Sequence, residues 1–192
     1  MNPINLRKYS ILTLKTLIVT AILLFGYYWL FLRPELIIWE KVQKNEQILI
    51  VQKNYLSQSR IIMVELIKSD VNDYYYPTHL KKTLELLSQI NNTALKKSKE
   101  TISYDPVLSL GRKNIRAYNR NILSGIYKIT EENKVFLSKQ KEMLSNLQLL
   151  NFDQQKEFLH TNQVVPLLTE QTNLTLEYDY WLNQITVLKR SL

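Results

Sequence analysis

The chain has 192 residues and carries 25 Lys and Arg against 17 Asp and Glu, so its formal net charge is +8. It contains no Cys, which excludes a disulfide framework, a thiolate metal site and a thiol nucleophile. It also has only three Gly and neither the G-x-G-x-x-G nor the P-loop pattern, which excludes the two common phosphate-binding loops.

The first predicted element is a membrane anchor at residues 10–33, after a short basic tail at residues 1–9. Residues 11–32 form an apolar run in which Lys15 is the only charged side chain. At ~1.5 Å per residue this run spans ~33 Å, about the thickness of the hydrocarbon core of a bilayer. It ends in bulky residues rather than in the small residues of a signal-peptide cleavage site, so we expect it to stay in the protein as a signal-anchor.

Side chains near both ends of the run suit a membrane interface. Tyr27, Tyr28 and Trp29 fit an aromatic belt, with Arg33 after them, while Lys15 can extend its ammonium toward the headgroups at the other end. The positive-inside rule does not decide the orientation, because three basic residues on one side are balanced by three on the other: Arg7, Lys8 and Lys15, then Arg33, Lys41 and Lys44. Since the tail is very short, we expect the N-terminus in the cytoplasm and the bulk of the chain outside it.

After the anchor, apolar residues recur at helical spacing, which predicts an all-α domain at residues 34–192. Proline and turn residues divide it into four helices at about 35–73, 78–103, 107–150 and 153–190, the last one kinked or interrupted at Pro166. A new helix is expected to be capped at Asn151 to Asp153. Short turns between amphipathic helices favour an elongated antiparallel, coiled-coil-like bundle. Gly125 is expected at a close helix contact, and three aromatic residues of the last helix are expected to serve as core and staple residues: Tyr178, Tyr180 and Trp181.

The first helix of this domain carries an apolar seam with steps of about seven residues, made of Ile38, Val42, Leu49, Leu56 and Met63. Polar residues interrupt the seam, as in coiled coils whose polar core residues specify the partner: Asn45, Gln52 and Ser59. Either the bundle buries the seam internally, or a second copy or another protein covers it. Because the first helix is ~18 Å longer than the second, we expect its membrane-proximal half, near residues 38–49, to lack a neighbour and to form the partner surface.

A basic patch surrounds the turn between the second and third helices. It has two acidic residues, Glu100 and Asp105, against seven basic ones: Lys96, Lys97, Lys99, Arg112, Lys113, Arg116 and Arg120. The patch is either a collar toward anionic headgroups or an acidic partner, or a solvated face with ion pairs to the last helix. The up-down arrangement leaves this turn ~18 Å above the bilayer, which exceeds the ~8 Å Debye length at physiological salt.

The overall charge does not indicate nucleic-acid binding. All 17 acidic residues follow Pro34, and four basic residues belong to the tail and anchor, which leaves a net of about +4 for the domain, an ordinary soluble surface. The two His, His79 and His160, have no H-E-x-x-H spacing, so a metal site is not expected. Since no catalytic motif occurs, we expect no enzyme activity, no cofactor and no small-molecule substrate.

The layout is similar to that of single-pass envelope proteins with a short cytoplasmic tail, such as pilus-alignment subunits and phage inner-membrane spanins. The likeness covers the layout alone. The absence of Cys suits a bacterial exterior. These features favour a scaffold or assembly subunit of a cell-envelope complex, in contact with the bilayer and with other membrane or envelope proteins or a second copy. The alternative is an extracytoplasmic helical module that senses a ligand and signals through a partner protein.

Overall fold

The computed structural model describes residues 3–68, 76–98, 113–160 and 164–191. These residues form helices and no strand, which confirms the all-α prediction. In chain order the helices are α1 (Pro3–Tyr27), the π-helical turn η1 (Tyr28–Leu32), α2 (Arg33–Lys68), α3 (Tyr76–Ser98), α4 (Lys113–Ala117), a second π-helical turn η2 (Tyr118–Ile122), α5 (Leu123–Leu149), α6 (Phe152–His160) and α7 (Val164–Ser191).

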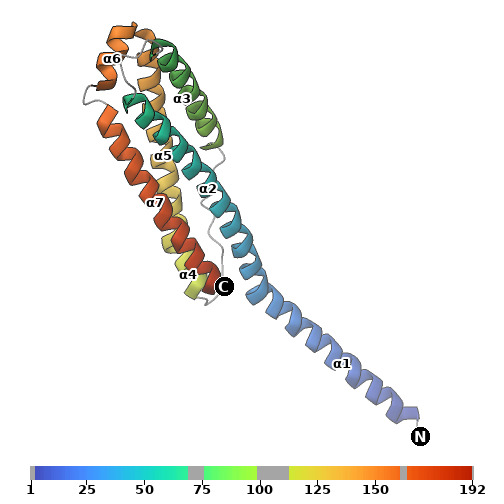
Figure 1. Cartoon of the computed structure of the whole chain (residues 1–192). Helices are drawn as coiled ribbons and strands as arrows, with labels where there is room; N and C mark the ends of the chain where they lie inside the picture. The colour runs from blue at the N-terminus through green and yellow to red at the C-terminus, as the bar shows by residue number, and fades with distance from the viewer. Residues whose placement is uncertain (1–2, 69–75, 99–112, 161–163, 192) are drawn as a thin grey trace.

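The N-terminal helix passes without a break into the bundle, so that α1, η1 and α2 form one rod, of which the N-terminal part, α1 and η1, projects from the bundle (Figure 1). The only irregularity in this rod is the π turn, where the backbone N–H of Arg33 donates to the carbonyl of Tyr28, five residues back. It ends two residues before Pro34, which has no N–H to donate and whose ring crowds the preceding turn. Widening the helix by one residue accommodates the proline without ending the helix.

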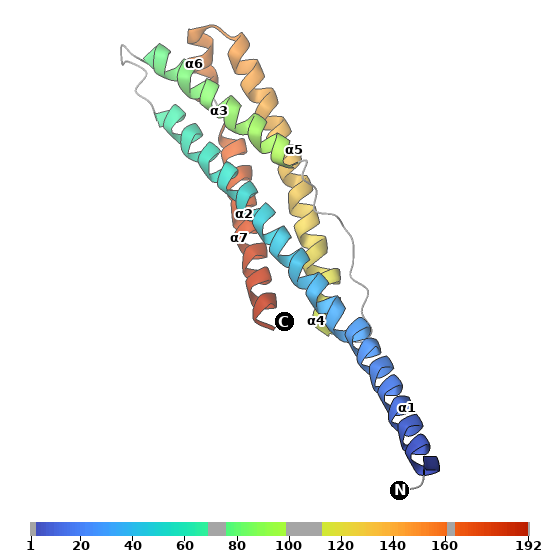
Figure 2. The same cartoon turned by 90° about the vertical axis from the view of Figure 1, so that its right-hand side faces the viewer.

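Four helices, α2, α3, α5 and α7, build the bundle, and each packs against two others: α2 against α7 and α3, α5 against α3 and α7. α2 and α5 run away from the projecting rod, while α3 and α7 run back toward it (Figures 1 and 2). The short helix α6 covers the far end, where it touches α2, α5 and α7. The C-terminus lies beside α4 at the end where the rod leaves, which we call the base of the bundle.

The core of the bundle follows a heptad pattern. On α2 the buried positions alternate in steps of four and three from Ile38 to Leu66, as expected for a helix that packs along its length in coiled-coil geometry. α5 buries a wider stripe, in which one row alternates in steps of four and three and further buried residues lie beside it; the row is Ile126, Thr130, Asn133, Leu137, Gln140, Leu144 and Leu147. Two apolar clusters result, one from the base to the middle of the bundle and one at the far end.

The observed ends of α5, α6 and α7 have local causes. α5 ends because Leu150 is extended, with φ −81° and ψ 150°. Asn151 then caps α6: its side-chain oxygen accepts from the N–H of Gln154 (2.9 Å), and the Gln154 side chain accepts from the N–H of Asn151 (3.1 Å). This confirms the cap predicted there. Pro166 is the third residue of α7 and so lies in its first turn, where its missing N–H costs nothing.

Gly125 marks a close contact between α5 and α7, as predicted. A Cβ atom placed on Gly125 would lie only 1.9 Å from the indole of Trp181. That position therefore needs a residue without a side chain. Glycine meets this need, although its helix propensity is lower than that of alanine.

Candidate functional site

The seam predicted on the first bundle helix lies inside the protein. Ile38, Val42 and Leu49 are 0% exposed, and the two seam residues nearer the far end, Leu56 and Met63, are 1% exposed. Ile38 and Val42 belong to the same core cluster as residues of α7. The prediction that residues 38–49 lack a neighbour is therefore wrong, because the C-terminal helix returns along α2 over the stretch that α3 does not reach.

The polar residues between the seam positions bond to other helices of the same chain. The side-chain amide of Asn45 donates to the hydroxyl of Tyr118 in η2 (3.0 Å). One heptad further along, Gln52 accepts from the hydroxyl of Tyr178 in α7 (2.6 Å). Asn45 and Gln52 were expected to specify an external partner; in the structure they bond within the chain.

The third polar layer joins three helices. The amide of Gln140 in α5 donates to the hydroxyl of Ser59 in α2 (2.7 Å) and accepts from the amide of Asn91 in α3 (2.9 Å). Unmade hydrogen bonds at buried polar groups cost ~1–3 kcal/mol each. A shift of any helix by one turn would break these pairs, so the polar layers fix the register of the bundle.

Burial changes the chemistry of the two tyrosines in these layers. Loss of hydration raises the pKa of Tyr118 to about 12, although the hydrogen bond from Asn45 acts in the opposite direction. Tyr178 is fully buried, and burial raises its pKa further, against a lowering contribution from Asn133. Both hydroxyls are neutral hydrogen-bonding groups at physiological pH, without the reactivity of a phenolate.

The residues predicted for the membrane anchor lie on the rod, where all but the half-buried Arg33 are exposed. Among the described residues one helix, near the N-terminus, is long and apolar enough to cross a membrane. The guanidinium of Arg33 lies over the ring of Trp29, 3.7 Å from its centre. Tyr27, Tyr28 and Lys15 are exposed as well. Such a cation–π pair beside aromatic residues is typical of the boundary between hydrocarbon and headgroups.

The predicted basic patch is divided in the structure. Lys96 and Lys97 lie at the end of α3, whereas Lys113, Arg116 and Arg120 lie on α4 and η2 at the base. The side chain of Asn91 donates to the backbone carbonyl of Leu137, which aligns the antiparallel helices α3 and α5 at these residues. Lys97, six residues further along α3, therefore lies beside about residue 131 of α5. Residue 131 is ~27 Å along the helix axis from Lys113. Lys99 and Arg112 fall outside the described residues.

An exposed apolar row on α7 was missed by the sequence analysis. Leu176, Tyr180 and Val187 share one face of the helix and are 63%, 54% and 53% exposed. Tyr178 is buried and Trp181 packs against the core, whereas Tyr180 lies outside the core and makes an edge contact with Trp181, with the ring centres 4.9 Å apart. The neighbouring Tyr178 and Tyr180 differ because residues two apart on a helix face different directions.

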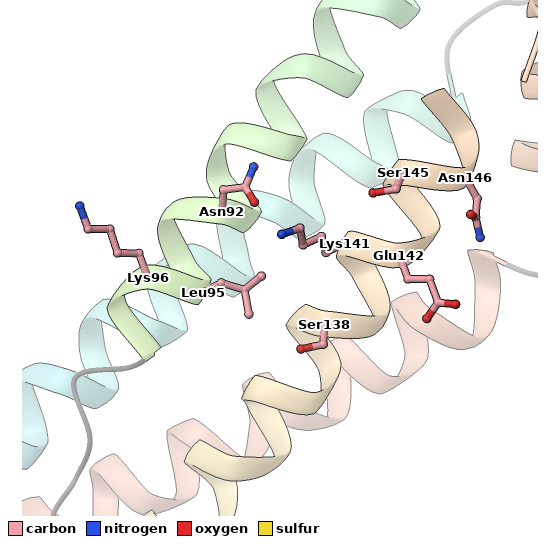
Figure 3. A pocket seen from close by; sticks show the side chains of 8 residues that line it. All are labelled: Asn92, Leu95, Lys96, Ser138, Lys141, Glu142, Ser145 and Asn146. Atoms are coloured by element: carbon pink, nitrogen blue, oxygen red, sulfur yellow. The ribbon is translucent and has the colours of Figure 1, made fainter. Parts of the chain in front are cut away.

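A polar groove of about 610 Å³ runs between α3 and α5 (Figure 3). Two lysines and a carboxylate line it together with hydroxyl and amide groups: Asn92, Lys96, Ser138, Lys141, Glu142, Ser145 and Asn146. A smaller adjoining cavity of about 80 Å³ reaches Asn91, whose side-chain oxygen is buried and has no hydrogen-bond partner. The amide orientation is fixed, because its nitrogen faces the Leu137 carbonyl, which only accepts.

Neither the family models nor the curated proteins nor the solved structures give a match to this chain. Within the described ranges there is also no group of three or more His, Asp or Glu side chains placed to hold a metal ion. The function is therefore inferred from the arrangement of the anchor, the bundle and the exposed surface.

Proposed function

We propose that this chain is a single-pass membrane protein whose helical bundle serves as a scaffold or assembly subunit of a cell-envelope complex. The N-terminal tail lies in the cytoplasm and the bundle outside it, in a bacterial envelope. The bundle works by protein–protein contacts and catalyses no reaction.

The observation that carries this proposal is the continuity of the rod. α1, η1 and α2 form one uninterrupted helix, so the bundle is attached to the apolar segment without a flexible linker. A rigid attachment holds the surfaces of the bundle at a set height and direction relative to the bilayer. That property suits a subunit that positions neighbouring proteins better than an enzyme that must reach a diffusing substrate.

The contact surface follows from what the bundle leaves exposed. The apolar seam of α2 is buried in the core of the bundle. The row formed by Leu176, Tyr180 and Val187 on α7 is exposed to solvent. Isolated exposed apolar residues are common, but several along one helix face offer a helix or groove of another protein a shared contact surface. This row supplies the protein-binding surface in the proposal.

Site-specific photo-crosslinking in cells tests the proposal. A photoreactive residue at Leu176 should form discrete, larger adducts with another membrane or envelope protein or with a second copy. Leu86 on α3 is the matched control, because it is also apolar and 48% exposed but lies on a helix that packs against α2 and α5 rather than α7. Identical adduct patterns at both positions, or none at Leu176, would refute a specific surface on α7.

The groove between α3 and α5 favours a second candidate, a ligand-sensing module that signals through a partner protein. The buried oxygen of Asn91 needs a donor, and Lys96 and Lys141 nearby suit an anionic group. A small molecule with both an amine and a carboxylate has this chemistry. Thermal unfolding in the presence of amino acids tests the idea: a stabilisation that Asn91→Leu abolishes supports sensing, and no shift with any amino acid refutes it.

A further inference from the structure

The structure sets how high the base of the bundle stands above the bilayer. If the hydrocarbon core ends near Arg33, Trp39 lies ~9 Å further along the rod at ~1.5 Å per residue. The ammonium of Lys189 in α7 is 5.6 Å from the ring centre of Trp39 and 2.7 Å from a carboxylate oxygen of Glu46, which places the last turn of α7 between the levels of these two residues. The headgroup layer itself extends ~5–7 Å beyond the hydrocarbon, so the base of the bundle adjoins it.

The same level is reached by α4. The hydrogen bond between Asn45 and Tyr118 aligns α2 with η2, and Lys113 lies five residues closer to the membrane than Tyr118. Counting back at ~1.5 Å per residue puts Lys113 ~10 Å above Arg33. Lys113, Arg116 and Arg190 are all exposed, and extended Lys and Arg side chains span several ångströms more.

Charge is distributed unevenly between the two ends of the bundle. At the base, from Arg33 to Glu46 together with α4 and the last turn of α7, the described residues include three acids, Glu35, Glu40 and Glu46, against seven basic residues: Arg33, Lys41, Lys44, Lys113, Arg116, Lys189 and Arg190. The far end, beyond the level of Met63, is balanced among its described residues, with Lys68, Lys81, Lys82, Lys141 and Lys156 against Glu65, Glu85, Glu142, Asp153 and Glu157. Net positive charge is therefore concentrated at the end that faces the membrane.

An apolar stripe connects this base to the anchor. Tyr28, Leu32, Leu36 and Trp39 lie on one face of the rod and, with Glu35, line an apolar hollow of about 400 Å³. The stripe continues past Arg33 up to the tryptophan that Lys189 contacts. Apolar surface at this height favours acyl-chain and glycerol contact over exposure to water.

We propose that the base of the bundle docks on the bilayer in which the anchor is embedded and binds the headgroups of anionic lipids through Lys113, Arg116 and Arg190. The stripe from Tyr28 to Trp39 contacts the acyl-chain boundary directly below. Docking holds the bundle at one tilt, with α7 on a defined side. This inference rests on the membrane anchor of the proposed function.

Lipid enrichment around the protein in vesicles measures the docking. The full chain is reconstituted into phosphatidylcholine vesicles that contain a trace of acyl-labelled phosphatidylglycerol or acyl-labelled phosphatidylcholine. Because the chain has no Cys, Val187→Cys near the base carries a single fluorescent donor. Each basic side chain at an anionic surface contributes about fivefold, so we expect phosphatidylglycerol to be enriched over phosphatidylcholine around the donor at least fivefold.

Charge reversal separates docking from general attraction. Lys113→Glu, Arg116→Glu and Arg190→Glu together should bring the enrichment close to one, and the corresponding Gln variant should lower it partly. The control, Lys81→Glu, Lys82→Glu and Lys156→Glu, changes the net charge equally at the far end and should keep the enrichment. About 1 M salt should abolish the enrichment of the unmodified protein, since the Debye length falls to ~3 Å.

The outcomes distinguish the two proposals. Equal enrichment in the unmodified protein and in the base variants, or enrichment that survives high salt, would overturn docking while leaving the anchor intact. Protein that fails to float with vesicles of either composition would overturn the anchor, and docking with it.

Discussion

Gly125 provides the sharpest test of the packing between α5 and α7. A Cβ on this residue would meet three atoms of the Trp181 indole at 1.9, 2.0 and 2.6 Å, against ordinary carbon contacts of ~3.5–4.0 Å. Gly125→Ala therefore forces the indole to move by ~1.5 Å or the helices to separate, and such overpacking costs ~1–3 kcal/mol. Alanine recovers ~1 kcal/mol of helix propensity. We expect a net loss of ~1 kcal/mol in the free energy of unfolding, the middle of the resulting range of ~0–2 kcal/mol.

The sign of the effect should reverse when the indole is removed. In a Trp181→Leu background the added methyl group has room, so Gly125→Ala should stabilise by up to ~1 kcal/mol. Urea unfolding of the full chain in detergent micelles, followed by far-UV circular dichroism, gives all four corners of this double-mutant cycle. Gly26→Ala is the control, because nothing lies within 4 Å of its added Cβ. Equal effects of Gly125→Ala in both backgrounds would refute the close contact.

Three further predictions concern the core and the boundaries of the domain. Leu49→Asp places a charge at a fully buried position and should cost at least ~3 kcal/mol, whereas Ile50→Asp, at a residue 43% exposed, should stay near neutral; similar losses for both would contradict an internal seam. Because burial raises the pKa of Tyr118 from 10.0 to about 12, and that of Tyr178 as well, the folded state favours their neutral forms. The resulting stability is full below pH ~10 and is lost as the pH rises toward 12 and beyond, so in a combined absorbance and circular dichroism titration the last tyrosines should ionise together with loss of helix. If all 12 tyrosines ionised while the helix content stayed constant, the buried tyrosine layers would be wrong. A fragment from about Glu35 to Leu192 should be soluble, strongly helical and elongated in small-angle scattering; substantial sheet or a spherical shape would contradict this.

The heptad pattern was sufficient to predict the helices but not the partner of each helix face. Ile38, Val42 and Leu49 have the same spacing whether they pack against another chain or against α7, since periodicity reports which face is buried and not what buries it. The lengths of the first two bundle helices do not show what covers the base, because the helix that covers it is the last in the sequence. Asn45 and Gln52 were recognised as polar positions of the seam. Their hydrogen-bond partners, Tyr118 and Tyr178, lie 73 and 126 residues further along the sequence.

Local signals predicted helix ends better than they predicted surfaces. Asn151 caps α6 through bonds within four residues, so the sequence contained the whole motif. Pro166 signalled an interruption, and its place in the first turn of α7 follows from the preference of proline for helix starts. The basic patch failed as a unit because the end of α3 and the start of α4 lie ~27 Å apart along the bundle, although they are close in sequence. The exposed row on α7 was not predicted, because the sequence alone does not show whether a single apolar residue on a helix is exposed or buried.

The proposal of a membrane-anchored bundle outside the cytoplasm is tested most directly by cysteine labelling in intact cells. The chain has no Cys of its own, so Leu149→Cys, at a residue 85% exposed on the far end of α5, and Asn2→Cys in the tail each provide one site. In carbonate-washed membranes both variants should remain in the pellet. A membrane-impermeant maleimide should label Leu149→Cys in intact spheroplasts and Asn2→Cys only after lysis; the reverse pattern would contradict the orientation, and carbonate-soluble protein would contradict the anchor.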